Sequence, residues 1–167
     1  MNSIFTRRSV RQFTDKQVEP EKIEQLLKAG MQAPSAWGQK AWNFIVVEGR
    51  ENLDKLADYN PYAGCLRGAG LGIIVLGNTS LMKASEYWEQ DLGAVTQNIL
   101  LEAVEQGLGA VWLGGAPEKD RMEYISKLYS LGNEMVPYCV IAVGYPQRED
   151  ANHYVDRYDK SRVRYIK

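Results

Sequence analysis

The chain has 167 residues, of which 45% are hydrophobic and 25% are charged. Its 20 basic and 21 acidic side chains leave a net charge of −1. This length suits one domain with a sizeable core, so we expect a single domain over residues 1–167. Because the charges balance and no long basic run occurs, neither a nucleic-acid partner nor a membrane-surface role is expected.

The cysteines and the histidine argue against metal and disulfide chemistry. Cys65 and Cys139 lie far apart, and neither has a Cys or His neighbour at zinc-ligand spacing. The only histidine, His153, stands in a polar segment and is interpreted as an exposed side chain. The longest apolar stretch, Ala69–Gly77, is far shorter than a membrane span, and no signal-peptide core begins the chain. We therefore expect no metal site and a cytoplasmic location.

Strands alternate with helices along the chain. Apolar residues at the helical period, with proline or glycine at the ends, indicate helices, and short apolar runs indicate strands. Helices are expected from Pro20 to the Gln32–Pro34 stretch, over Arg50–Tyr59, over Asp91–Leu108, and from Pro117 to Gly132. Strands are expected over Phe44–Val47, Leu71–Leu76, Ala110–Leu113 and Cys139–Gly144, the last in a central position. Alternation alone favours a doubly wound parallel sheet.

Residues 146–167 combine many charges with scattered aromatic and aliphatic side chains. They hold too few apolar residues for a core of their own and too many for a simple disordered tail. We expect an arm that packs on its own domain or on a partner chain; the alternative is a dangling tail.

Two glycine-rich stretches differ in their context. Gly68–Gly72 resembles a dinucleotide fingerprint, but it precedes a strand, whereas that loop must follow a strand and open a helix. Gly114 and Gly115 end a strand, where paired glycines let backbone N–H groups approach a flat ligand closely. The first stretch is therefore interpreted as a loop, and the second as a candidate binding turn.

The strongest local signal is the basic cluster of Arg7, Arg8, Ser9 and Arg11. Planar guanidinium groups and a small hydroxyl suit a phosphate dianion. The alternative, an exposed charged segment without a ligand, is common for such clusters. The Lys160–Arg162 stretch repeats this composition, so the two ends of the chain could surround one phosphate.

Ala33–Trp42 reads APSAWGQKAW, with Trp37 and Trp42 on either side of Gly38. Aromatic side chains beside small residues could line a slot for a planar ring. From these residues alone, a helix-to-strand connection anchored by tryptophans is the favoured interpretation.

Five segments in order together resemble the nitroreductase family of FMN-dependent oxidoreductases. They are RRSVRQF at 7–13, APSA at 33–36, DLGAVTQNILLEAVEQGLGAVWLGG at 91–115, VIAVGYP at 140–146 and KSR at 160–162. The resemblance implies an α+β three-layer sandwich, with a mostly antiparallel sheet flanked by helices, in place of the parallel sheet. It also implies an intertwined homodimer with two FMN molecules at the interface and residues 146–167 packed on the partner subunit.

The resemblance implies roles for particular residues. The FMN phosphate would be held by Arg7 and Ser9 together with Arg8, and Lys160 and Arg162 would complete that site. Arg11 would reach the pyrimidine edge of the flavin, and Leu113, Gly114 and Gly115 would face the ring with a backbone N–H near N5. Pro34, Ser35 and Ala36 would contact the cofactor from the partner subunit, and Gly38 is a further cofactor-binding position. No side chain is expected to act as a catalytic nucleophile or acid, because flavin N5 carries the hydride.

The chain departs from the family pattern after the APSA element. Gly38 stands where the family commonly has an asparagine that hydrogen-bonds near the flavin, and Lys40 and Ala41 replace the usual Gln-Pro. These departures bear on ring hydrogen bonding, redox potential and substrate choice.

The function that the resemblance implies is reduction of nitroaromatic, quinone or related electron-poor small molecules by NADH or NADPH, in a ping-pong mechanism through bound FMN. One alternative is a specialised flavin reductase, such as a dehalogenase or enone reductase. Another is a flavin-binding or sensing protein with little turnover. A third is a module without flavin whose arginines bind some other anion.

Overall fold

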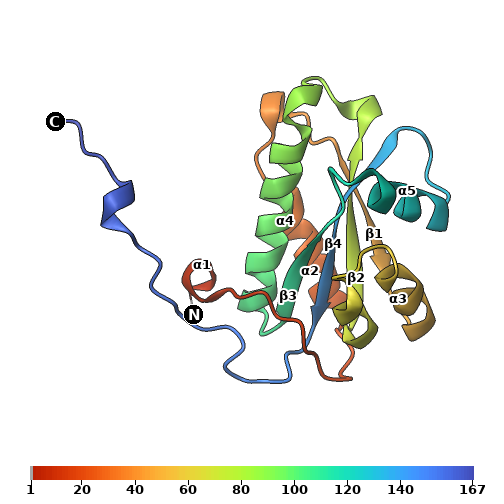
Figure 1. Cartoon of the computed structure of the whole chain (residues 1–167), viewed down its shortest axis with the longest axis horizontal. Coiled ribbons are helices and arrows are strands. Elements are labelled where there is room, and N and C mark those ends of the chain that lie inside the picture. Colours follow the sequence, from red (N-terminus) through yellow and green to blue (C-terminus); the bar gives the residue numbers. More distant parts are fainter. Residues whose placement is uncertain (1) are drawn as a thin grey trace.

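The computed structural model describes residues 2–167. A four-stranded sheet lies between two layers of helices, and the C-terminal segment extends away from them (Figure 1). The helices are α1 Ser3–Thr6, α2 Pro20–Met31, α3 Arg50–Ala57, α4 Trp88–Glu105 and α5 Lys119–Leu128. The strands are β1 Trp42–Val47, β2 Leu71–Asn78, β3 Gly109–Gly114 and β4 Met135–Gly144. Short 3₁₀ turns include η1 Ala36–Gly38, η2 Gly64–Gly68 and η5 Lys160–Arg162.

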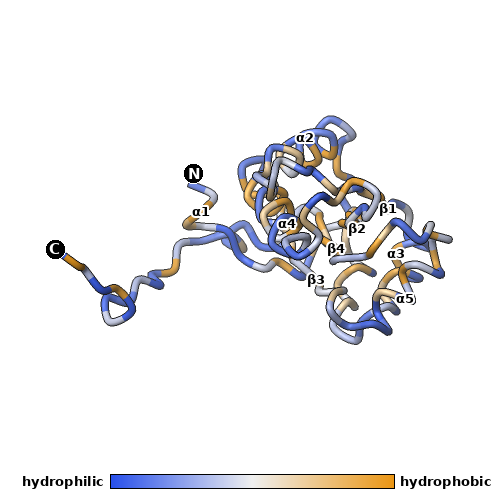
Figure 2. The backbone as a smooth tube through the Cα atoms, turned by 90° about the horizontal axis from the view of Figure 1, so that it is seen from above, coloured by the Kyte–Doolittle hydropathy of each residue, from blue (hydrophilic) through white to orange (hydrophobic). Residues whose placement is uncertain are grey.

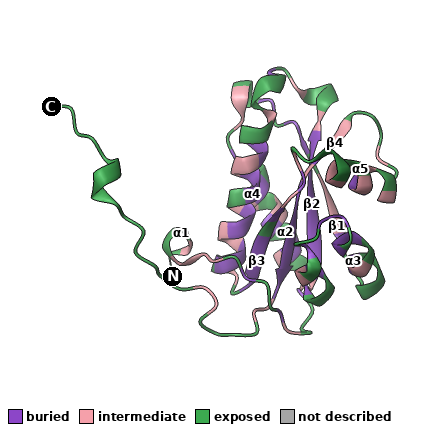
Figure 3. Cartoon of the chain, viewed as in Figure 1, coloured by how far each residue is buried: buried purple, intermediate pink, exposed green. Residues whose placement is uncertain are grey.

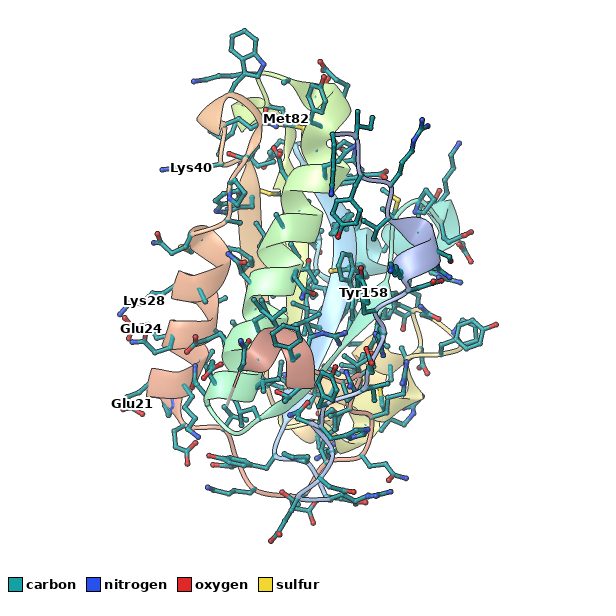
Figure 4. The ribbon with its side chains drawn as sticks, turned by 90° about the vertical axis from the view of Figure 1, so that its left-hand side faces the viewer. Glu21, Glu24, Lys28, Lys40, Met82 and Tyr158 are labelled. Atoms are coloured by element: carbon teal, nitrogen blue, oxygen red, sulfur yellow. The ribbon has the colours of Figure 1, made fainter. Side chains whose placement is uncertain are left out.

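Helices α2, α3, α4 and α5 form in the segments where the periodicity predicts them, whereas α1 was not predicted. Pro20 is the first residue of α2, where its missing N–H costs no hydrogen bond. The outer face of α2 is charged, and Glu24 and Lys28 form an ion pair of 2.7 Å there (Figure 4). Some boundaries differ: α4 begins at Trp88 and ends at Glu105, three residues before each predicted end, and α3 ends at Ala57. Helix α5 begins at Lys119 with Glu118 as its N-cap, two residues after the proline expected to open it. None of the helices within residues 2–167 is both long enough and apolar enough to cross a bilayer.

The sheet has the strand order β1-β2-β4-β3, and all three neighbouring pairs are antiparallel. The parallel sheet expected from alternation is therefore wrong, and the mostly antiparallel sheet implied by the resemblance is confirmed. The physical reason lies in β4, which is antiparallel to both β2 and β3 and separates them. Strands β2 and β3, joined through α4, do point the same way but are not neighbours. Alternation along the chain does not determine which strands become adjacent.

Successive residues of each strand supply opposite faces of the sheet, as the pleat requires. In β4, Cys139, Ile141 and Val143 pack against α2 and α4, whereas Val140 and Ala142 pack against α3, η2 and α5. The sheet therefore carries one core on each face, which accounts for the three layers. Strand β4 is buried on both faces and has a strand on either side, so its expected central position is confirmed.

The N-terminal segment runs along the open edge of β3. Ser9 forms a parallel bridge with Ala110, and the Val10 N–H donates to the Ala110 carbonyl over 3.0 Å. The approach is close because Gly109 has no side chain, and a Cβ there would lie 2.6 Å from a Val10 methyl carbon. A glycine in β3 thus sets how near the basic cluster comes to the sheet.

The C-terminal arm has an attached part and a free part. The Gln147 N–H donates to the Gln12 carbonyl, and Asn152 accepts a hydrogen bond from the Arg8 N–H and donates one to the Leu108 carbonyl. Residues 153–167 are all exposed and extend away from the helices (Figure 3). They mix hydrophilic and hydrophobic positions along their length (Figure 2). Their own chain leaves Tyr158 and Ile166 uncovered, so packing on a partner stays a prediction.

Candidate functional site

The basic cluster alternates between the core and the surface. Val10 is buried against Gly109, and its neighbours Ser9 and Arg11 are exposed on the opposite side of the extended segment. Arg7 and Arg8 are half-buried. The register along β3 therefore directs Ser9 and Arg11 to solvent, where a ligand can reach them.

Arg7 and Arg8 line a hollow of about 220 Å³, together with residues 154–158 of the arm. Arg8 donates from Nη1 to the Arg7 carbonyl over 2.7 Å, whereas its Nε and Nη2 atoms are buried without a hydrogen-bond partner. Burial lowers the pKa of Arg7, and the nearby guanidinium groups of Arg157 and Arg8 lower it further. Arg157 was missed in the sequence because no motif includes it, and its only signal is its place in the charged arm.

Ser9 and Arg11 line a second hollow of about 340 Å³, which also includes Arg148 and His153. Arg148 forms a two-pronged ion pair with Asp150, with N···O distances of 2.8 and 2.9 Å. Arg11 donates to the Ser9 carbonyl over 3.3 Å. The basic cluster thus separates two hollows, with Arg7 and Arg8 at one and Ser9 and Arg11 at the other.

The Leu113–Gly115 turn lies where β3 ends, at the edge of the sheet. The Gly115 N–H donates to the Tyr138 carbonyl of β4, so in an antiparallel ladder the Gly114 N–H points to the open edge. A Cβ at Gly114 would meet nothing within 4 Å, whereas one at Gly115 would lie 2.8 Å from the Tyr138 carbonyl oxygen. The open space and the free N–H at Gly114 suit the edge of a flat ring.

Three polar side chains that the sequence did not reveal hold this turn in place. The Tyr59 hydroxyl donates to the Leu113 carbonyl over 2.9 Å. Asn60 and Arg121 both donate to the Gly114 carbonyl, over 3.1 and 3.3 Å. These hydrogen bonds to the Leu113 and Gly114 carbonyls fix the orientation of the turn.

The loop that contains Pro34, Ser35, Ala36 and Gly38 is held to the first turn of α4. The buried Asp91 accepts hydrogen bonds from the Ala36 N–H over 2.9 Å and from Gln39 Nε2 over 2.6 Å. The Gln39 Oε1 atom accepts from the Lys83 and Ala84 N–H groups. Gln39 was not recognised in the sequence because its partner Asp91 lies 52 positions away.

The backbone of this loop is unusual. Trp37, Gly38 and Lys40 have φ values of 55°, 59° and 48°, in the left-handed region that only glycine adopts freely. Trp37 is 83% exposed and Lys40 points into solvent (Figure 4), while Trp42 is buried in the core. The two tryptophans therefore do not line a common slot, and Trp42 anchors the connection as the favoured interpretation expected.

The predicted site residues do not all meet within one chain. The 35–40 loop is hydrogen-bonded to Asp91 near the start of α4, and α1 is hydrogen-bonded to Glu105 at the end of α4. Those positions are roughly 21 Å apart along a helix that rises 1.5 Å per residue. Lys160 and Arg162 lie in η5, out along the arm, where Arg162 pairs with Asp159 at 2.9 Å (Figure 1). The phosphate role of these two residues stays a prediction.

Comparison with known proteins connects this geometry to a family. The sequence profile described as the nitroreductase family matches residues 4–66 and 60–145. The chain belongs to the nitroreductase family. The resemblance of five short motifs is thereby confirmed over most of the chain.

Individual nitroreductase relatives match nearly the whole chain. A protein of Methanothermobacter thermautotrophicus, provisionally named NADH dehydrogenase/NAD(P)H nitroreductase, is 40% identical over 98% of this chain and 84% of its own. A crystal structure provisionally named an NADH oxidase, from Clostridium acetobutylicum, is 48% identical with a TM-score of 0.95, covering 99% of both chains. A provisionally named nitroreductase of Desulfovibrio desulfuricans, solved in complex with FMN, is 30% identical with a TM-score of 0.81. It covers 95% of this chain and 91% of its own.

These matches confirm the expected fold class and enzyme class at the level of the family. Nitroreductases have this α+β fold, with an antiparallel sheet flanked by helices, and they are FMN-binding NAD(P)H oxidoreductases.

Proposed function

We propose that this nitroreductase is a homodimeric FMN-dependent enzyme that passes electrons from NADH or NADPH to electron-poor small molecules such as nitroaromatics or quinones. The observation that carries the proposal is the open edge at Gly114. There a backbone N–H points to the open edge of β3, and a Cβ would meet nothing within 4 Å, on the strand whose first residues contact the basic cluster. The FMN-bound relative with the same fold supports the choice of cofactor.

The residues present fit FMN on two counts. The buried and unpartnered Nε and Nη2 atoms of Arg8 lack an acceptor, which an anionic group near the basic cluster would supply. A flat ring can approach Gly114 because no side chain covers it. The phosphate and the ring of FMN match these two features in chemistry.

Bound FMN would supply the redox chemistry, accepting two electrons from a nicotinamide and passing them to the acceptor. The protein's own residues position it and set its electrostatics. Arg11, exposed at the second hollow, would place positive charge at the pyrimidine edge, where reduction adds negative charge. The Gly114 N–H, with its carbonyl fixed by Asn60 and Arg121, would donate near the reacting edge of the ring. Donor and acceptor would use this one face in turn, as in a ping-pong mechanism.

The proposal includes a second copy of the chain because one copy separates the predicted residues. The 35–40 loop and the basic cluster lie at opposite ends of α4. A two-fold interface would bring the loop of one subunit to the flavin of the other. The uncovered apolar side chains of residues 153–167 would gain a surface to pack on.

Purified protein tests the proposal directly. We expect yellow protein whose flavin absorbance bleaches when NADH or NADPH is added without oxygen and returns when a quinone or nitroaromatic is added. A colourless protein that ignores added FMN would overturn it. Initial rates at several donor and acceptor concentrations should give parallel double-reciprocal lines, and intersecting lines would contradict the shared face.

One feature favours a second candidate, a flavin-binding protein with little turnover. Gly38 has no side chain to hydrogen-bond the ring, and Lys40 places a charge on the same loop. Bound flavin that neither NADH nor NADPH bleaches would support that candidate. Flavin that bleaches but is reoxidised only by enones or halogenated aromatics would instead indicate a specialised reductase.

A further inference from the structure

The Tyr59 hydroxyl is bonded to the peptide group whose N–H faces the open edge of β3. It donates to the Leu113 carbonyl oxygen over 2.9 Å. The Leu113 carbonyl and the Gly114 N–H are the two polar ends of one planar peptide group, and in a trans peptide they point in opposite directions. Holding the carbonyl therefore also fixes the direction of the Gly114 N–H.

The Leu113 carbonyl does not need Tyr59 in order to be satisfied. Leu113 is paired with Val140 in the antiparallel ladder. Two residues further along, the Gly115 N–H donates to the Tyr138 carbonyl. Hydrogen-bonded and non-hydrogen-bonded pairs alternate in such a ladder, so Leu113 and Val140 exchange both backbone hydrogen bonds. The Tyr59 hydroxyl is thus a second donor to an oxygen that already has one, which its two lone pairs permit.

Tyr59 is suited to be a permanent donor. The residue is only 4% exposed, and burial raises its pKa above the usual range, so the hydroxyl keeps its proton at neutral pH. Its backbone N–H donates to the Leu56 carbonyl in the last turn of α3. The next residue, Asn60, donates to the Gly114 carbonyl over 3.1 Å. The hydroxyl is therefore held in place between the end of α3 and the turn.

A second hydrogen bond to the carbonyl strengthens the N–H at the other end of the peptide. Donation to a carbonyl oxygen draws electron density from the peptide nitrogen, and successive hydrogen bonds polarise one another, by roughly 10–30% per bond. A Cβ at Gly114 would meet nothing within 4 Å, so the edge of a flat ring can come close to this N–H. Both the direction and the donor strength of the N–H then depend on Tyr59.

We infer that Tyr59 is a positioning residue for the flavin ring, whose hydroxyl orients and polarises the Gly114 N–H through the Leu113–Gly114 peptide. This role rests on the proposed function and deepens it, because it assigns control of a backbone contact to a side chain outside every motif recognised in the sequence. Reduction adds negative charge to the ring, so a polarised N–H directed at the ring favours the reduced form.

Tyr59→Phe tests the inference, because it removes the hydroxyl and keeps the buried aromatic ring. We expect flavin binding to be about three- to tenfold weaker, by the same factor for FMN and for riboflavin, since the weakened contact is to the ring and not to the phosphate. The midpoint potential of the bound flavin should fall, and its absorption maximum should shift toward that of free flavin. Fluorescence titration, equilibration with a redox dye and absorption spectra measure the three effects.

Tyr124→Phe is the matched control, because the Tyr124 hydroxyl also donates to a backbone carbonyl over 2.9 Å, but its partner is Lys55 of α3 and not the turn. It should leave the affinity, the potential and the spectrum unchanged. A Tyr59→Phe protein with the potential and spectrum of the parent would overturn the inference, whatever its affinity. Loss of cooperative urea unfolding in Tyr59→Phe would also overturn it, since the hydroxyl would then be needed for the fold as a whole.

Nuclear magnetic resonance follows the backbone contact itself. In the unmodified chain the Gly114 amide proton should shift when riboflavin or FMN binds, and in Tyr59→Phe that shift should be smaller. A chain that binds flavin without moving the Gly114 resonance would overturn the inference while leaving the flavin function intact. A chain that binds neither flavin would overturn the proposed function itself, and this inference with it.

Discussion

Gly109, Gly114 and Gly115 lie within seven positions, and an added Cβ would have a different consequence at each of them. Gly109 lets the N-terminal segment approach β3, because a Cβ there would meet Val10 at 2.6 Å. Gly115 lets β3 and β4 stay paired, because a Cβ would meet the Tyr138 carbonyl oxygen at 2.8 Å. Gly114 faces empty space and has no packing reason to be glycine. The ligand contact proposed for Gly114 is therefore compatible with the packing around it.

For Gly109→Ala we expect a free energy of unfolding lower by about 1–3 kcal/mol, because the added methyl overpacks against Val10. Displacing Val10 also moves Arg7 and Arg8, so FMN affinity should fall. Urea unfolding and flavin titration measure the two effects. A variant as stable as the parent, with the same affinity, would show that the segment adjusts without cost.

Gly114→Ala should behave in the opposite way. Its methyl enters empty space, so the urea midpoint should stay within the scatter of the parent protein. The same methyl would lie where the proposed ring approaches, so flavin affinity should fall at least tenfold. Unchanged affinity would place the ring elsewhere.

Among the elements, α4 organises both ends of the proposed site. Its first turn holds the 35–40 loop through Asp91 and Gln39, and its last turn accepts the Ser3 N–H at Glu105. Three residues of that loop keep positive φ values, which the surrounding hydrogen bonds must enforce. Gln39 is central to this, because its amide satisfies Asp91 and two backbone N–H groups at once.

Gln39→Ala should lower the free energy of unfolding by about 1–3 kcal/mol, because it leaves buried polar groups without partners. Thermal and urea unfolding measure the loss. Gln97→Ala is the matched control, because Gln97 is an exposed glutamine of α4. Its substitution should be nearly neutral for stability. An equal loss of unfolding free energy in the two variants would contradict the proposed role of Gln39 in holding the loop.

A second contact between elements predicts pH dependence. The Tyr145 hydroxyl, just after β4, donates to Glu19 at the N-cap of α2 over 2.7 Å. This hydrogen bond is the largest of the causes that lower the Glu19 pKa from 4.5 to about 2, and a backbone hydrogen bond and the neighbouring Lys16 add to it. A lowered carboxyl pKa in the folded state stabilises the fold above the unfolded pKa. That stabilisation is lost as the pH falls from about 4.5 toward 2.

Tyr145→Phe should therefore be less stable than the parent at pH 6, and the difference should shrink as the pH is lowered to 3. Urea unfolding across this range measures it. Tyr62→Phe is the control, because that side chain is 77% exposed and its hydroxyl bonds to nothing in residues 2–167. A difference independent of pH would show that Glu19 is not the group involved.

At the scale of the whole molecule, residues 153–167 contribute nothing to either core but hold exposed aromatic side chains. The proposed dimer gives them a surface. Light scattering of the full chain should then give a mass of about twice 18.9 kDa. A chain ending at Asn152 should keep its far-ultraviolet circular dichroism and cooperative unfolding, yet have the monomer mass and bind FMN weakly. A monomeric full chain would contradict the proposal, and a dimeric truncated chain would show that the arm does not hold the dimer.

The main helices and strands and the family were predictable from the sequence. Pro20, Gly107 and the apolar runs of the strands mark where elements begin and end, because these signals depend on local backbone preferences. Five motifs in order sufficed to recognise a nitroreductase and to replace the parallel sheet that alternation favoured. Each motif could be recognised from its residue types and their spacing, without knowing which side chains are in contact in the folded protein.

Contacts between residues far apart in the chain became evident only in the folded structure. It placed β4 between β2 and β3, Gln39 against Asp91, and Arg157 beside Arg7. No local pattern encodes such contacts, because closing a loop of dozens of residues costs entropy that only the assembled core offsets. The basic cluster is evident from the sequence, whereas Arg157 shares a hollow with Arg7 and Arg8 only because the folded chain brings the arm to the N-terminal segment.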